Sequence, residues 1–481
     1  MVDEHSVSLL TGTASLSIGV GAVATEAVPG PSLALRYNSS GGSSEFGLGW
    51  SLAIPSVARG TDKGVPAYEP DDTFVATGVG ELVPVIDGSG HAGPGVAPDG
   101  FVEVKYYRPR IEGAFTRFER WVADDRKVHW QAVDRENTRS VFGLTAGCRV
   151  AKPGFDQLVF EWFLERTVDA RGNVVQYAYK REDGAGFGDD AQEPVEADRA
   201  AAWRRLGVAE GRRAHRRDDT NQRLYLKHVL YGNSAASRAN GASQPVPSAT
   251  YPLQEGDPQG ALDGLPVHAL QSLDDDAFRH AIVLDYGEHA LDTTPFVGAG
   301  TWDWRLDPYS ACKSGIELRT RRLCRRFIHF SRFSANEFIG APHSGTDDWM
   351  AMRSLVLTHE HGPVATKLVS LQECHLTWNG SAYAEDRPPA MTFSYAPLAT
   401  AAFSVQSMPA ASTFGLPQGV TGSFQWADLN GEGISGVLTS YGGAWAYKRN
   451  VGDAELLPPT VLRKRPNAPL GAAPTGMALM D

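Results

Sequence analysis

The sequence contains few cysteines. Only four occur in 481 residues, and no two of them form a Cys-x-x-Cys pair: Cys148, Cys312, Cys324 and Cys374. Four cysteines are too few to stabilise a chain of this length through disulfide bonds. We therefore interpret them as buried or incidental thiols.

Positive charge is also scarce. Lys and Arg number 45 against 56 Asp and Glu, which gives a formal net charge of −11. A protein whose main role is to bind nucleic acid needs a basic surface, so this class of partner is excluded. One local exception is the arginine-rich stretch 198–217, which contains Arg204, Arg205, Arg212, Arg213, Arg216 and Arg217. We interpret it as a solvated surface insertion, and a patch that binds an acidic partner is the alternative.

Targeting and membrane-spanning segments are missing from the sequence. The N-terminus carries Asp3 and Glu4 and has no Lys or Arg before Arg36, so it lacks the positive region of a secretory signal. No apolar run approaches the roughly 18 residues of a membrane helix. We predict no membrane span, and export would need a non-classical route.

Familiar catalytic motifs are absent as well. There is no Gly-x-Ser-x-Gly nucleophile elbow, and residues 19–25 hold only two glycines of a dinucleotide fingerprint, without a helical pattern after them. His359 and His361 lack the spacing of a zinc-binding helix but would share one face of a strand. We interpret them as a polar strand end, with a zinc site as the alternative.

Glycine, proline and aromatic residues are abundant instead. The chain has 51 Gly and 30 Pro, and 10% of its residues are aromatic, which favours many short strands and tight turns. Period-2 alternation is the dominant pattern, as in Ile282, Leu284 and Tyr286. We predict an all-β protein.

The stretch 38–59 joins a glycine and serine run to a Phe-Gly-Leu-Gly-Trp segment. A phosphate loop would need a Lys and Ser/Thr after the glycines, and these are absent. Phe46, Leu48 and Trp50 alternate, so all three side chains can enter one core face while the glycines allow close backbone approach. We predict that these three residues anchor the core.

Residues 1–415 form one predicted β-rich domain, with insertions at 183–220 and 233–265. Aromatic strands that adjoin Asp, Asn or Gly turns are natural hairpin units, such as the strand of Tyr177 and Tyr179 after the turn at 169–173 and the strand that ends at 231–233. They also resemble the hairpins of RHS/YD repeats. The predicted architecture is a multi-stranded β-sandwich or RHS-like hairpin assembly.

Residues 416–481 form a second predicted unit. Asp428, Asn430 and Glu432 stand at alternate positions before Gly433, a spacing that lets oxygen ligands converge on calcium. Neither the EF-hand nor the FG-GAP loop is complete, so a polar turn of the same shape is the alternative. Asp481 follows Asp428 by 53 residues (481 − 428) and resembles the start of a second such loop. We expect an incomplete β-propeller repeat, truncated at the start of the next.

Three stretches of the chain resemble the sequences of a known family. Residues 11–85 are similar to the opening of the SpvB-like domain of Salmonella virulence plasmid B proteins and of TcB subunits of insecticidal Tc toxin complexes. Residues 306–330 resemble an Arg-rich stretch of that family and 391–397 its closing strand. The resemblance implies a secreted toxin or virulence protein, cytoplasmic before release, whose propeller docks on other complex subunits and whose RHS repeats surround a toxic segment.

Two functions remain after these exclusions. The first is a non-catalytic structural and delivery module that binds protein partners, and it implies no enzyme activity. An arginine-modifying ADP-ribosyltransferase would need two glutamates separated by one residue, and no such pair occurs in the sequence. The alternative is a β-rich carbohydrate-binding or carbohydrate-active module, in which Trp302 and Trp304 form a sugar-stacking platform.

Overall fold

The structure is a computed structural model. It describes residues 2–8, 12–22, 30–86, 94–95, 101–185, 221–233, 278–292, 294–296, 298, 300, 302–334, 347–362, 365–396, 407–416, 424–431, 433–441, 443–453 and 455–464. The chain divides into two compact units, Met1–Ser394 and Tyr395–Asp481. The boundary predicted from sequence, after residue 415, lies inside the second unit.

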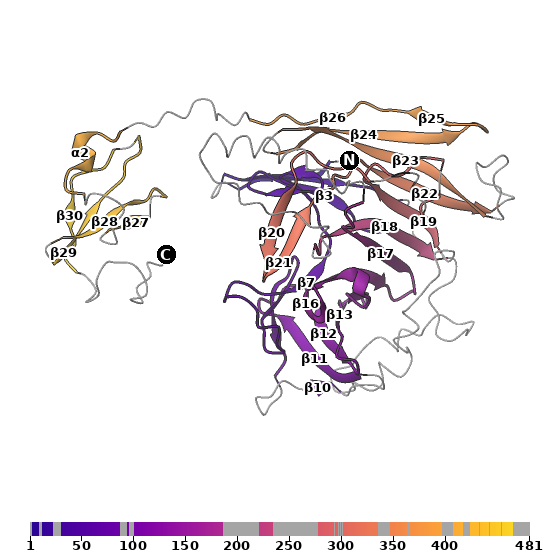
Figure 1. Cartoon of the computed structure of the whole chain (residues 1–481), viewed down its shortest axis with the longest axis horizontal. Coiled ribbons are helices and arrows are strands. Elements are labelled where there is room, and N and C mark those ends of the chain that lie inside the picture. Colours follow the sequence, from indigo (N-terminus) through magenta and orange to yellow (C-terminus); the bar gives the residue numbers. More distant parts are fainter. Residues whose placement is uncertain are drawn as a thin grey trace. The chain divides into compact units, whose positions relative to one another are not determined.

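The first unit contains a closed ring of antiparallel strands, drawn in purple in Figure 1. The pairings run from β7 to β8, β9, β11, β12, β13, β14 and β16, and β16 pairs again with β7. These strands are β7 (Ser56–Arg59), β8 (Phe74–Ala76), β9 (Gly80–Pro84), β11 (Phe101–Pro109), β12 (Arg117–Ala123), β13 (Val128–Val133), β14 (Arg139–Phe142) and β16 (Phe155–Val168). Closure leaves the ring without a free edge strand.

Aromatic side chains fill the ring. Phe74 lies 4.8 Å from Trp130 and 5.9 Å from Tyr107 between ring centroids, and Trp130 lies 6.2 Å from Trp162. All four are buried. Because alternate residues of a strand share a face, β8, β11, β13 and β16 can each direct one of these rings to the interior. The short elements β10 (Pro94–Gly95), η1 (Ala146–Cys148) and β15 (Arg149–Lys152) flank these strands.

A long antiparallel meander continues from β16. Each strand pairs with the next one, except that β26 returns to β24. The strands are β17 (Val174–Arg181), β18 (Leu224–Asn233), β19 (Phe278–Asp285), β22 (Arg326–Ser334), β23 (Asp347–Glu360), β24 (Lys367–Trp378), β25 (Tyr383–Asp386) and β26 (Met391–Thr392). They follow one another from magenta to orange in Figure 1.

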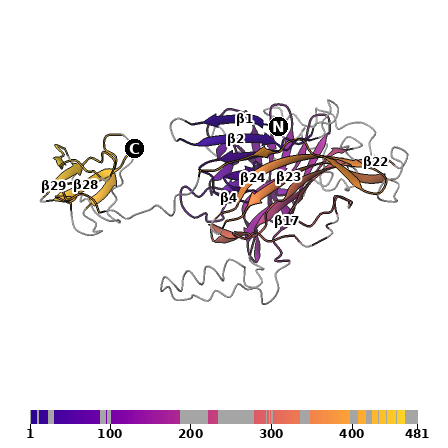
Figure 2. The same ribbon diagram turned by 90° about the horizontal axis from the view of Figure 1, so that it is seen from above.

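A smaller sheet packs on one face of the meander. It comprises β1 (Val2–Val7), β2 (Ala14–Gly19), β3 (Ala34–Asn38) and β6 (Trp50–Leu52), and Figure 2 shows it in indigo beside β23 and β24. Leu35 and Trp50 belong to the same buried cluster as Phe327, Leu355 and Leu371 of the meander. Two sheets that enclose one apolar layer form a β-sandwich. Two hairpins stand beside it, β4 (Ser43–Ser44) with β5 (Gly47–Leu48) and β20 (Tyr309–Lys313) with β21 (Ile316–Thr320).

The second unit holds a four-stranded antiparallel sheet in the order β27-β28-β29-β30. Its elements are α2 (Ala410–Thr413), β27 (Phe424–Ala427), β28 (Gly436–Tyr441), β29 (Ala444–Lys448) and β30 (Thr460–Val461). Ala427, Leu438, Trp445 and Tyr447 form its core. The Ser412 hydroxyl accepts a hydrogen bond from the Leu456 amide at 3.0 Å, which attaches α2 to this sheet.

The all-β prediction is confirmed, since only 2% of the structure is helical. Within the described ranges, no helix is long and apolar enough to cross a membrane. Most of the two predicted insertions and the whole arginine cluster of 204–217 lie outside the described residues, as does Asp481. All four cysteines are free thiols; three are buried and Cys312 is exposed.

Candidate functional site

One cavity of the first unit, which we name the hairpin cavity, has a volume of about 400 Å³ and lies beside β20 and β21. Its lining comes from segments far apart in the sequence: Ser43, Ser44, Glu45, Ser51, Leu52, Ile54, Ser56, Thr77, Val150, Glu161, Phe163, Tyr179, Arg223, Leu224, Leu226, Tyr309, Ala311, Lys313, Leu318 and Thr320. This volume is in the range of ligand-binding pockets.

The β20–β21 hairpin presents one face to the hairpin cavity. Tyr309, Ala311 and Lys313 line it, and in the register their partners are Thr320, Leu318 and Ile316. Alternate residues point the opposite way: the Ser310 hydroxyl donates to Glu317 Oε1 at 2.6 Å on the outer face. The hairpin therefore has two different faces, and the face that carries Tyr309, Ala311 and Leu318 lies toward the hairpin cavity.

Two acidic groups reach the hairpin cavity from different layers. Glu45 accepts a hydrogen bond from Arg223 at 2.6 Å. Burial lowers the pKa of Arg223, but the Glu45 carboxylate and neighbouring tyrosines outweigh this and raise it above its ordinary value. Glu161 accepts a 2.8 Å hydrogen bond from the Ser56 hydroxyl. Among the described residues Glu161 has no ion pair, and neither has Lys313, which also lines this cavity.

Trp302 and Trp304 do not form an exposed sugar-stacking platform, so that part of the carbohydrate hypothesis is wrong. Trp302 is only 2% exposed. The Arg322 guanidinium lies 4.2 Å from the Trp302 ring centroid and 4.4 Å from that of Trp304. Both rings therefore contact one guanidinium, which belongs to an arginine of the same chain. Arg322 also donates to Glu182 at 2.6 Å.

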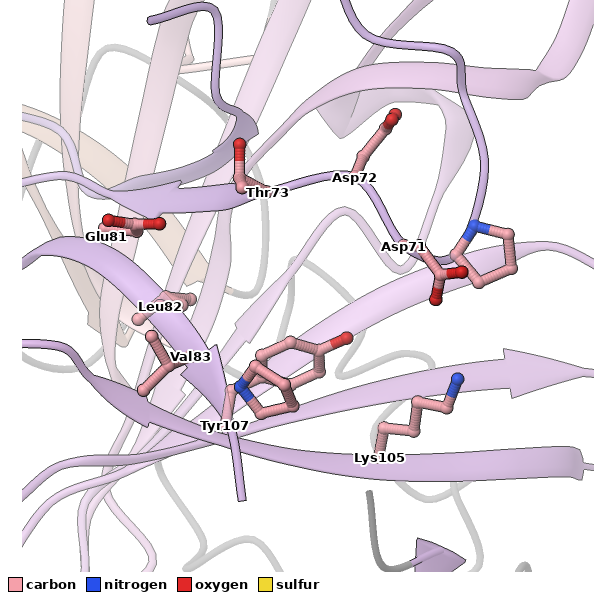
Figure 3. A pocket seen from close by; sticks show the side chains of 10 residues that line it. Asp71, Asp72, Thr73, Glu81, Leu82, Val83, Lys105 and Tyr107 are labelled. Atoms are coloured by element: carbon pink, nitrogen blue, oxygen red, sulfur yellow. The ribbon is translucent and has the colours of Figure 1, made fainter. Parts of the chain in front are cut away.

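A second pocket, of about 190 Å³, lies at the ring beside β9, β11 and residues 70–73, which precede β8. Figure 3 shows the Asp71 carboxylate, the Tyr107 hydroxyl and the Lys105 ammonium pointing toward one another there. Two other carboxylates of this pocket are neutralised: Asp72 pairs with Arg59 at 2.6 Å, and Glu81 pairs with two cations.

Hydrogen bonds from those cations, Lys63 and Arg110, lower the pKa of Glu81, and burial raises the pKa of Tyr107. Neither shift moves the pKa of the group toward neutral pH, where a general acid or base needs its pKa to lie.

The His359 and His361 rings lie 6.5 Å apart between centroids. His359 Nε2 lies 3.1 Å from the Phe46 carbonyl oxygen, and burial lowers the pKa of His359 to about 4. Among the residues that the structure describes, no group of three metal-ligating side chains is found. The polar strand end is the interpretation that these contacts favour.

The predicted calcium loop lies only partly within the described residues, because Glu432 falls outside them. The Asp428 carboxylate accepts hydrogen bonds from the Gly431 amide at 2.9 Å and the Gly433 amide at 2.6 Å. Asn430 is exposed. The calcium site of Asp428, Asn430 and Glu432 stays a prediction.

The three predicted core residues have different surroundings. Phe46 and Trp50 are each 1% exposed, whereas Leu48 is half-buried. Phe46 stacks on Phe327 at 5.9 Å, and Trp50 contacts Phe393 at 4.9 Å between centroids. Gly47 and Gly49 have φ of +108° and +79°. At a positive φ the backbone departs from a regular strand. The side chains of Phe46, Leu48 and Trp50 therefore do not all lie on one face of a single strand.

Sequence reasoning did not identify Glu45, Glu161 and Arg223. Glu45 and Arg223 are 178 residues apart. No motif connects them, because strand pairing in the folded chain brings them together.

The comparisons with known proteins cover both units. The family model described as Salmonella virulence plasmid 65kDa B protein matches residues 8–333. The proteins named mono(ADP-ribosyl)transferase SpvB from Salmonella choleraesuis (strain SC-B67) and Salmonella enteritidis are each 28% identical over 365 residues, which cover 73% of this chain and 52% of the relative. The chain thus spans about half the length of the curated relatives that it matches.

Solved structures show the same fold. The N-terminal domain of effector protein SpvB from Salmonella typhimurium strain LT2 is 26% identical, with a TM-score of 0.53 over 72% of this chain and 94% of that one. The crystal structure of TcdB2-TccC3 is 24% identical, with a TM-score of 0.67 over 96% of this chain and 20% of that one. Together with the family model, which spans more than half of the sequence, these matches show that the chain belongs to the SpvB family.

Proposed function

We propose that this chain is a non-catalytic structural and partner-docking region of a secreted bacterial toxin or virulence protein. The observation that supports this most is the match to 94% of the SpvB N-terminal domain, in a chain that spans about half of the transferases named SpvB. The fold of TcdB2-TccC3 extends the likeness to 96% of the chain. In this proposal the ring and the sandwich form part of a shell around an effector, and other complex subunits dock on the chain.

The proposal includes the second unit. A four-stranded antiparallel meander is the unit from which propeller blades are built, and the order β27-β28-β29-β30 fits it. We assign residues 416–481 to a first propeller-type repeat of the FG-GAP kind, with calcium at the Asp428 loop as its cofactor.

An activity assay tests the non-catalytic role. The purified chain is incubated with labelled NAD⁺ and either a host-cell lysate or poly-arginine, and transfer of the label to protein is measured. No transfer above the enzyme-free blank is expected, because no pair of glutamates separated by one residue occurs in the chain. Label incorporation that scales with the amount of chain would refute this part of the proposal.

An assembly assay tests the delivery role. Co-expression of the chain with subunits of a Tc toxin complex is expected to yield one assembly on size-exclusion chromatography. Separate elution of the chain from all of these subunits would contradict the proposal.

A further inference from the structure

We infer that the open edge of β20 takes up an extended peptide segment of a partner protein, whose alternate side chains enter the hairpin cavity and place a basic group at Glu161. The inference rests on the proposed function, since it names the chemistry of one docking partner. Strand addition to a sheet edge is a recurring mode of peptide recognition: the backbone hydrogen bonds give affinity and the side-chain pockets give specificity.

The first argument is the unpaired edge. β20 pairs with β21 from Tyr309 to Lys313, around the turn of Ser314 and Gly315, which both have positive φ. In a hairpin with such a two-residue turn, the residues next to the turn exchange hydrogen bonds, and so does every second residue after them. The backbone groups of Ser310 and Cys312 therefore point away from β21. No strand within the described ranges pairs with that edge.

The other edge of the hairpin is occupied. The Asn221 side chain donates to the Arg319 carbonyl at 2.9 Å and accepts from the Arg319 amide at 3.1 Å. At the turn, the Tyr68 hydroxyl donates to the Ser314 carbonyl at 3.2 Å. The hairpin is thus fixed along β21 and at its tip, which leaves β20 as a preorganised template for an added strand.

The second argument is the chemistry of the hairpin cavity below this edge. Several of its neutral hydroxyls are already engaged within the chain: Ser44 donates to the Trp50 carbonyl, and Ser56 bonds both Thr77 and Glu161. Among the charged groups that line this cavity, Glu161 and Lys313 have no ionic partner, and they carry opposite charges. Apolar and aromatic side chains line the same cavity, including Leu52, Phe163 and Leu318.

A peptide satisfies these groups better than a glycan does. A neutral sugar can hydrogen-bond the carboxylate and the ammonium, but it brings no charge to pair with either of them. A peptide supplies an amide and a carbonyl to the β20 edge, an Arg or Lys to Glu161, an acidic group to Lys313, and apolar side chains between them. These features favour a segment of alternating apolar and charged residues.

The first experiment screens the full chain against fluorescein-labelled heptapeptides in which arginine, glutamate, leucine or glycine is fixed at each position in turn, with binding followed by anisotropy. Selection for arginine at one position, with leucine two residues away, is expected. Glu161→Gln should remove the arginine selection and weaken the best peptide about tenfold, the scale of one charge-assisted hydrogen bond. Asp71→Asn, which neutralises a carboxylate of the other pocket, is the matched control and should change nothing.

The second experiment tests the edge itself. Cys312→Pro removes one outward amide of β20 without touching the β20–β21 hydrogen bonds, and it should weaken the best peptide roughly fivefold. Cys312→Ser keeps the amide and should bind like the parent chain. In case the proline variant unfolds, the same amide-to-carbonyl contact is removed from the peptide side: N-methylation at alternate positions should reduce binding in one register only.

Four outcomes would overturn the inference. Three concern the peptides: no positional selection in the library, binding that is indifferent to Glu161→Gln, or N-methylation effects without a two-residue period. The fourth is binding to a glycan array that depends on Glu161. If assembly with the toxin-complex subunits is intact while peptide binding fails, only this inference falls. If no assembly forms although the peptides bind at β20, the proposed function fails.

Discussion

Replacing Arg322 with alanine removes a guanidinium that is 0% exposed and that connects several layers of the first unit. It donates to Glu182 at 2.6 Å, to the Trp302 carbonyl at 2.6 Å and to the Ala185 carbonyl at 3.0 Å. Its plane also lies between the rings of Trp302 and Trp304. The substitution therefore removes an ion pair, backbone hydrogen bonds and two cation–π contacts at once.

The expected loss of stability follows from the carboxylate that stays buried after Arg322 is removed. The Glu182 side chain is 1% exposed, so Arg322→Ala leaves a buried carboxylate without its cation. Breaking a buried ion pair on one side costs about 3–5 kcal/mol of unfolding free energy. The double variant Arg322→Met with Glu182→Gln removes both charges, and its cost should be smaller than that of Arg322→Ala alone.

The assay is urea unfolding of the whole chain, followed by tryptophan fluorescence, with Lys63→Ala as the matched control. Lys63 pairs with Glu81 at 2.9 Å, but its side chain is 61% exposed, so its loss should cost about 1 kcal/mol or less. If Arg322→Ala unfolds within about 1 kcal/mol of the control, or if the double variant is less stable than the single one, the stabilising role of the buried pair is refuted.

Three further predictions concern the core, acid stability and metal binding. Trp50→Ala should lose roughly 3–5 kcal/mol on urea unfolding, as truncation of a buried aromatic does, and Leu48→Ala clearly less; equal losses would contradict the anchor role of Trp50. Burial lowers the pKa of His129 and His329 to about 3, below the unfolded value of about 6.5. The unfolded chain therefore binds these protons first, so the melting temperature should fall as pH drops from about 6.5 toward 3; a flat profile would contradict this. Titration with calcium should give one site by calorimetry that Asp428→Ala abolishes, whereas an unchanged isotherm would leave only a polar turn.

The strand that contains Ile282 and Leu284 shows how much of the fold the sequence pattern predicted. Alternation in residues 281–286 predicted a strand with Ile282, Leu284 and Tyr286 on one face, and these three share a buried cluster. The pattern did not reveal that Ala281 and Val283 are buried in a second cluster on the opposite face. A period-2 pattern reports the chemistry of one strand, whereas burial on both faces depends on the layers that other segments place against it.

The candidate site was less accessible to prediction. Trp302 and Trp304 were found as a pair with one direction, yet only the fold placed Arg322 between them. Glu161 was not predicted from the sequence, because the Ser56 hydroxyl that donates a hydrogen bond to it lies 105 residues away in the chain.

The sequence by itself determined the all-β class, the exclusion of a disulfide scaffold, and the family resemblance, since these depend on composition and on neighbouring residues. Only the tertiary structure decided the ring closure, the burial of Trp302 and the hairpin cavity. The physical reason is that antiparallel pairing joins segments such as β7 and β16, whose paired residues Ala58 and Glu161 are far apart in the chain. Such contacts depend on the register and order of many strands together, and a local pattern records neither.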